Sequence, residues 1–122
     1  MANYSADTDL GLYLREVDNL PPLYDTHTEA KRVIDAYLRS KGVSDADILL
    51  LGTTTLAQLK VASCYWTLGT FFGGFVGDAG ASEAASRYMA GYQATMSALY
   101  IEYSGSEGTT SDVLSSGDCL LG

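Results

Sequence analysis

The sequence predicts an all-α protein, a small bundle of four to five helices over residues 1–103 followed by an extended C-terminal arm over residues 104–122. First, apolar residues recur at spacings of three and four in several segments, which is typical of amphipathic helices. Second, no segment alternates apolar and polar residues over a useful length, so we expect no strand. Third, 11 of the last 19 residues are Gly, Ser or Thr, a composition that cannot form its own core.

The first two helices are predicted from their apolar stripes and their starting residues. Ser5 is placed to cap a helix over residues 6–17, and two prolines, Pro21 and Pro22, end that segment. A second helix follows and ends near Gly42. Its start contains Thr26 and Glu29 at the T-x-x-E spacing of a capping box, in which each side chain satisfies a free backbone N–H.

The middle of the chain predicts a short helix or turn capped by Ser44 and then a long helix. The long helix opens at Thr55, with Gln58 at capping-box spacing, and extends to about Phe72. It is apolar nearly all round, whereas a surface helix needs only one apolar stripe. We therefore expect it to be covered on several faces, with Leu68 and Phe72 as candidates for contact with a neighbouring copy.

The last helix is predicted from about Ala81 to Tyr103, and it carries two different faces. One holds large residues, among which Tyr88 and Tyr92 are further candidates for a subunit interface. The other holds small residues, including Gly91, and small residues let another helix approach closely.

The arm at residues 104–122 contains few apolar residues, and these form two pairs. We expect the arm to extend from the bundle and to bind a partner through Val113, Leu114, Leu120 and Leu121. Ordering such a segment costs about 1–2 kcal/mol per residue in backbone entropy, so the partner must supply many contacts.

Charge and hydropathy exclude two kinds of partner. The net charge of −8 argues against binding nucleic acid by phosphate neutralisation and against an anionic membrane surface. No residue from Val61 to Gly77 is charged, but a membrane span needs about 20 apolar residues and this run contains four glycines. The start of the chain lacks the basic and apolar regions of a signal peptide.

The residues that usually carry chemistry form no recognisable motif in the sequence. The single histidine, His27, is interpreted as a surface residue at a helix start. The two cysteines, Cys64 and Cys119, are interpreted as reduced thiols in a cytosolic protein, and nothing completes a zinc site. We therefore predict no catalytic, cofactor-binding or metal-binding residues, and a protein that is not an enzyme.

Three segments together resemble the head-to-tail adaptor (head completion or connector) proteins of tailed bacteriophages. They are "RVIDAYLRSKG", "LAQLKVASCYWTLGTFF" and "SRYMAGYQATMSALYIEY", in this order along the chain. The resemblance covers about residues 5–103 and lies in the pattern of the helices, not in a single motif.

This resemblance implies a structural role in the neck of the virion, between capsid and tail, for a protein made in the bacterial host cytoplasm. Family members form a ring, usually of twelve copies, beneath the portal protein, extend the DNA channel and offer a platform for a tail or neck protein. A C-terminal arm reaches the portal. An acidic subunit suits a channel through which DNA slides without specific binding.

Two other classes of protein remain open. One is a small helical enzyme or ligand-binding bundle that encloses a ligand beside Trp66, Phe71 and Phe72. The other is a regulatory interaction protein whose acidic tail wraps a basic partner. Native mass, alone and with candidate partners, separates these alternatives from a ring.

Overall fold

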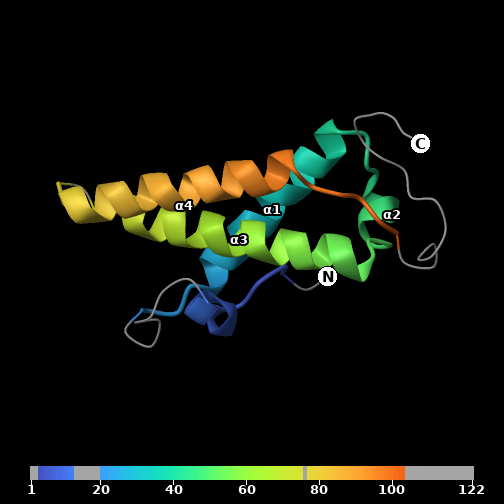
Figure 1. Cartoon of the computed structure of the whole chain (residues 1–122). Helices are drawn as coiled ribbons and strands as arrows, with labels where there is room; N and C mark the ends of the chain where they lie inside the picture. Colours follow the sequence, from blue (N-terminus) through green and yellow to red (C-terminus); the bar gives the residue numbers. More distant parts are fainter. Residues whose placement is uncertain (1–2, 13–19, 76, 104–122) are drawn as a thin grey trace.

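The computed structural model describes residues 3–12, 20–75 and 77–103 of the chain (Figure 1). Within them all regular structure is helical: a 3₁₀ helix η1 (Asp7–Leu12) and the α-helices α1 (Tyr24–Ser40), α2 (Asp45–Ile48), α3 (Thr53–Gly73) and α4 (Ala79–Ser97). The predicted all-α bundle is confirmed for these residues. The arm at 104–122, and with it Val113, Leu114, Leu120 and Leu121, lies outside the described residues.

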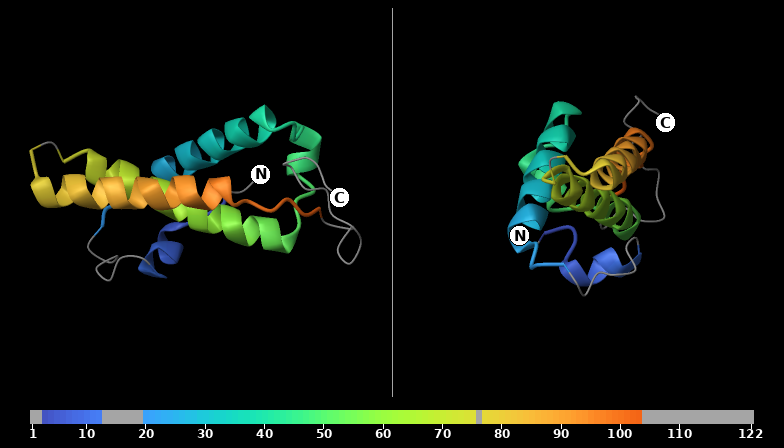
Figure 2. Two further views of the ribbon diagram at one scale, coloured as in Figure 1. Left: turned by 45° about the horizontal axis from the view of Figure 1, so that its top comes forward. Right: turned by 90° about the vertical axis from the view of Figure 1, so that its left-hand side faces the viewer.

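Helix α3 is the centre of the molecule. Helix α4 runs antiparallel beside it, and α1 and η1 pack on its other sides (Figure 2). This arrangement explains why α3 is apolar nearly all round, because three elements of its own chain cover it. The expected coverage on several faces is thus intramolecular, and it does not require a neighbouring copy.

Two glycines allow α3 and α4 to approach closely. A Cβ atom at Gly69 of α3 would lie 2.7 Å from Met89 Sδ, and one at Gly91 of α4 would lie 3.0 Å from the Tyr65 ring. Contacts this short leave no room for a larger residue without displacement of the partner side chain. The close approach expected at the small face of the last helix therefore occurs at Gly91, where the partner is α3.

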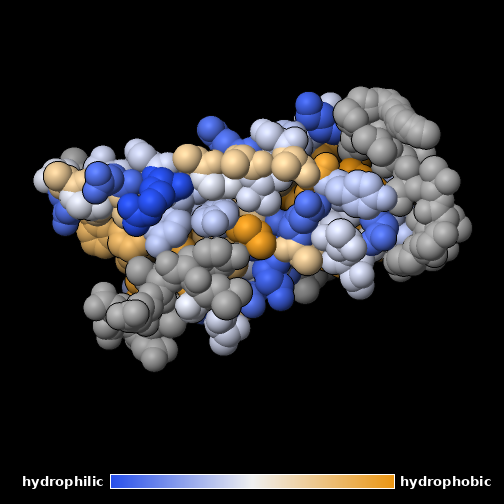
Figure 3. Space-filling model, in the orientation of Figure 1, coloured by the Kyte–Doolittle hydropathy of each residue, from blue (hydrophilic) through white to orange (hydrophobic). Residues whose placement is uncertain are grey.

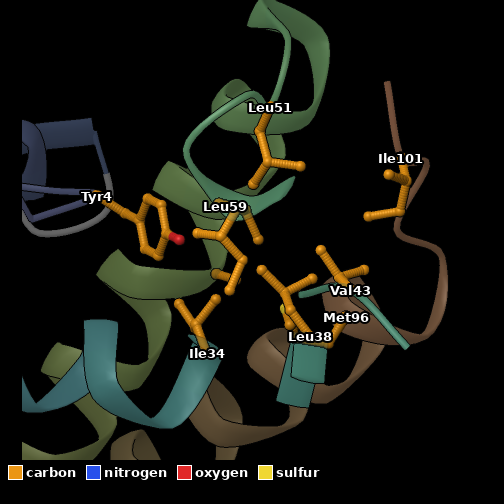
Figure 4. Close-up of a cluster of buried hydrophobic side chains, with 10 residues drawn as sticks. Tyr4, Ile34, Leu38, Val43, Leu51, Leu59, Met96 and Ile101 are labelled. Carbon is orange, nitrogen blue, oxygen red and sulfur yellow. The ribbon is translucent and has the colours of Figure 1, made fainter. Parts of the chain in front are cut away.

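The core consists of two clusters along α3. The first joins α1, α3, the end of α4 and the chain ends of the bundle (Figure 4): Tyr4, Ile34, Leu38, Val43, Ile48, Leu51, Leu59, Ala62, Met96 and Ile101. The second lies further along α3: Leu10, Leu23, Cys64, Leu68 and Tyr88.

The second cluster corrects part of the predicted subunit interface. Leu68 has none of its surface exposed and Tyr88 only 7%, so both belong to the core of the single chain and leave almost no surface for a neighbour. Phe72 and Tyr92 are partly buried, and they pack against the second and the first cluster respectively. Phe72 also stacks on the Tyr88 ring, with 5.9 Å between centroids.

Several helix ends differ from the prediction. The first segment is a short 3₁₀ helix, and residues 13–19 lie outside the described residues. Helix α1 begins at Tyr24, before the predicted capping box, and no side chain caps its start; the Leu23 N–H donates to the Asp7 carboxylate at 3.3 Å. Helix α2 is capped as predicted, with the Ser44 hydroxyl accepting from the Asp47 N–H.

The predicted cap at Thr55 has another function. Helix α3 already begins at Thr53, and the Thr55 hydroxyl binds the segment that follows α4. It donates to the Tyr100 carbonyl at 2.8 Å and accepts from the Glu102 N–H at 2.6 Å. Gln58 accepts from the Tyr100 N–H at 2.9 Å. Helix α4 ends at Ser97, before the predicted Tyr103, and these bonds hold the chain after it.

Candidate functional site

The N-terminal segment, residues 3–12, crosses α1 and α3 and brings polar side chains together at the crossing. The Tyr4 hydroxyl donates to Asp35 of α1 at 2.5 Å, and Asn3 donates to Thr28 at 3.1 Å. Burial, followed by the hydrogen bond and the charge of Asp35, raises the pKa of Tyr4 above its ordinary value. These contacts fix the segment on α1, and they position the residues that follow.

Four polar side chains from this segment, α1 and α3 form a hydrogen-bonded series. Ser63 Oγ of α3 is 2.6 Å from Ser5 Oγ, and Ser5 Oγ is 2.6 Å from His27 Nδ1. His27 Nε2 is 3.0 Å from Asp7 Oδ1. Ser5, His27 and Ser63 are buried, and His27 has 1% of its surface exposed, whereas Asp7 is open to solvent on one side.

The hydrogen bonds define a direction along this series. A carboxylate oxygen accepts hydrogen bonds, so we assign the ring proton to Nε2, which donates a hydrogen bond to Asp7. In the neutral ring Nδ1 then accepts, and Ser5 donates to it. The remaining acceptor position of Ser5 takes the hydroxyl proton of Ser63. The arrangement is a nucleophile, a base and an orienting carboxylate, although the two ring nitrogens are used in the reverse of the usual order for a Ser–His–Asp triad.

A cavity of about 710 Å³ borders these hydrogen-bonded side chains. Its wall includes Ser5, Asp7, His27, Tyr24 and Lys60. Lys60 Nζ is 3.8 Å from the carboxylate of Asp9, and it supplies the positive charge at this wall. The cavity is large enough for a small organic molecule.

Cys64 lies next to Ser63 in α3, and its thiol has Ser5 as a hydrogen-bond partner. Burial, followed by the Asp9 carboxylate, raises the pKa of the Cys64 thiol to about 12. A thiol is reactive as the thiolate, so Cys64 is inert at neutral pH. Cys119 lies outside the described residues.

A second, smaller cavity of about 270 Å³ lies at the turn between α3 and α4. Phe71, Phe72 and Phe75 line it, and their rings contact one another at centroid distances of 5.1–6.5 Å. The sequence placed a possible ligand beside Trp66 and two of these phenylalanines. The structure brings the phenylalanines together with Phe75, and Trp66 is not part of the cavity wall.

The interpretation of His27 as a surface residue is wrong. His27 occupies the buried face of α1 together with Ala30, Ile34 and Leu38. The signal was present in the sequence, because His27 precedes these residues at the helical spacings of three, seven and eleven. Ser5 and Asp7 could not be assigned to the same site, since only the fold brings them beside His27, which is 22 and 20 positions later.

Other kinds of site find no support in the described part of the chain. There, no three His, Cys, Asp or Glu side chains are close enough to hold a metal ion. None of the helices within residues 3–12, 20–75 and 77–103 is long and apolar enough to cross a bilayer. Comparison of the chain with protein-family models, curated proteins and solved structures finds no match.

Proposed function

We propose that this chain is a head-to-tail adaptor of a tailed bacteriophage, a structural subunit that forms a ring beneath the portal protein. The three segments that resemble this family are the main parts of α1, α3 and α4. These helices pack on one another in a single body, which is consistent with one inherited unit of structure.

The observation that carries the proposal is the presence of two separate apolar surfaces. Leu49 and Leu50 in the turn between α2 and α3 are exposed by 66% and 51%, and Leu56 in the first part of α3 by 36% (the leucine surface). At the other end of α3, Phe75 is 48% exposed beside Phe71 and Phe72 (the phenylalanine surface). Figure 3 shows hydrophobic colouring at the end of the molecule where α3 turns into α4.

The separation of these surfaces favours a ring. The 21 residues of α3 span about 30 Å, so the two surfaces lie at opposite ends of this helix. A head-to-tail contact that closes into a ring needs two different surfaces on each copy, which bind each other on neighbouring copies. A symmetric dimer needs only one.

The other partners follow from the family resemblance. The arm reaches the portal through Val113, Leu114, Leu120 and Leu121, and the opposite side of the ring receives a tail or neck protein. The excess of 15 acidic over 7 basic residues supports a channel wall that DNA passes without binding. In this role the protein resides in the neck of the virion.

Charged substitutions on the two surfaces test the proposal. Leu50→Asp and Phe75→Asp each place a charge where a neighbour would bury it, and both sites tolerate charge in a single chain because they are exposed. We expect folded monomers by circular dichroism and native mass spectrometry, whereas the wild type and an exposed polar control, Gln93→Asp, form rings. A wild type that stays monomeric both alone and with the portal of its source contradicts the proposal.

A further inference from the structure

We propose that Ser5, His27 and Asp7 form an acyl-transfer site that hydrolyses small esters, with Ser5 as the nucleophile. This activity is independent of the proposed role in a ring, and either can fail without the other. The inference rests on the arrangement of side chains around His27 and on the adjoining cavity.

The geometry meets the requirements of an activated serine. Ser5 Oγ is 2.6 Å from His27 Nδ1, within reach for direct proton transfer to the base. Asp7 Oδ1, 3.0 Å from Nε2, fixes the orientation of the ring and stabilises the positive charge that forms when Nδ1 accepts a proton. Ser63 completes the arrangement, since its hydroxyl occupies the acceptor side of Ser5 and directs the Ser5 proton toward His27.

The surroundings select a substrate class. Ser5 and His27 both line the 710 Å³ cavity with only 5% and 1% of their surfaces exposed, so a substrate would have to reach Ser5 through this cavity. Lys60 is the cation that lines this cavity, and a cation in the cavity can stabilise negative charge on a carbonyl oxygen. An ester with a small acyl group and an aromatic or aliphatic alcohol fits a cavity of this size.

The reaction is complete with water as the second reactant. Ser5 Oγ attacks the ester carbonyl carbon, and its proton passes to His27 Nδ1. Collapse of the tetrahedral intermediate breaks the bond to the alcohol oxygen, which takes the proton from His27. Water then attacks the acyl-serine with His27 again as base, and it releases the carboxylic acid and restores the Ser5 hydroxyl.

A buried polar chain of this kind can also serve stability alone, and covalent labelling separates the two roles. A fluorophosphonate probe reacts with an activated serine, because its phosphorus binds Oγ as fluoride leaves. We expect the full-length protein to be labelled on the peptide that contains Ser5, as identified by mass spectrometry, and to hydrolyse p-nitrophenyl acetate. Ser5→Ala removes one hydroxyl and should abolish both, while Ser86→Ala, at an exposed serine of α4, should change neither.

Variants of the other residues test their separate roles. His27→Gln should lower the hydrolysis rate by about 10²–10⁴-fold, the usual contribution of a general base. Asp7 acts as a positioning residue, so Asp7→Asn should lower kcat with little change in KM. Asp7→Glu keeps the carboxylate and should retain a higher kcat than Asp7→Asn. The absence of label on Ser5 in protein that is folded by circular dichroism overturns the proposal, as does hydrolysis that Ser5→Ala leaves unchanged.

Discussion

His27 shows how a single residue can connect distant segments of this chain. Its ring lies between Ser5, Asp7 and α3. Nδ1 contacts the hydroxyls of Ser5 and Thr67, and Nε2 contacts the carboxylate of Asp7. Removal of the ring would leave the buried hydroxyl of Ser5 without its acceptor at Nδ1. An unsatisfied buried polar group costs about 1–3 kcal/mol.

We therefore expect His27→Ala to lower the free energy of unfolding by about 1–3 kcal/mol while any ring still forms. The matched control is Thr26→Ala, one residue earlier. Because α1 begins at Tyr24, Thr26 is not its cap, and this change should stay within about 0.5 kcal/mol. Urea unfolding measures both variants. Equal losses in the two variants would contradict a specific stabilising role of the His27 imidazole.

Cys64 predicts how stability depends on alkaline pH. Its pKa is raised from about 9 to about 12 by burial, so the unfolded chain loses the thiol proton at lower pH than the folded chain does. The stabilisation is complete below about pH 9 and is lost as the pH rises toward 12. The urea midpoint should therefore fall between pH 8 and pH 10.5. Cys64→Ala should show a smaller fall; an equal fall in both proteins would assign the effect to the tyrosines alone.

At the scale of elements, the pairing of α3 with α4 depends on Gly69 and Gly91. Alanine is intrinsically better than glycine in a helix by up to about 1 kcal/mol. We nevertheless expect Gly69→Ala to destabilise the protein by about 1–3 kcal/mol, because the new methyl group collides with Met89. Gly73→Ala is the control, since its Cβ would meet only Ala85 at 3.9 Å. If thermal unfolding ranks both variants above the wild type, the two helices are less closely packed than described.

Most elements were predictable because their signals are local. The stripe on α1, the Ser44 cap and the apolar surface of α3 each depend on residues within a few positions of one another. The start of α1 was not predictable from local residues, because no side chain caps it and the N–H of Leu23 bonds to Asp7 from a different segment. The Thr55 and Gln58 side chains likewise fit a capping box in sequence, yet they bind the segment after α4.

The candidate site was less predictable than the fold for the same reason. The buried position of His27 follows from helical spacing, but its contacts with Ser5, Asp7 and Thr67 arise only when three segments of the chain pack together. The interface prediction met a related difficulty: an apolar side chain such as Leu68 has the same sequence signal whether its own chain or a neighbour covers it.

At the scale of the whole molecule, the arm provides a test of the proposed portal contact. The two core clusters of the described bundle are built from residues between Tyr4 and Tyr103, so we expect truncation after Tyr103 to leave helicity and solubility unchanged. The loss of Val113, Leu114, Leu120 and Leu121 should abolish stable binding to the portal of its source. Pull-down with the truncated and full-length proteins measures this, and unchanged affinity would assign the arm another role.

The central claim is that two different apolar surfaces join neighbouring copies head to tail, and mixing two variants tests it most directly. Leu50→Asp retains the phenylalanine surface, and Phe75→Asp retains the leucine surface. Each variant, when it is not mixed with the other, should be monomeric by native mass spectrometry, both without and with the portal. An equimolar mixture has one intact interface, so it should form heterodimers and nothing larger, while the wild type closes into rings. A mixture that contains only monomers, or variants that assemble as the wild type does, would contradict the account.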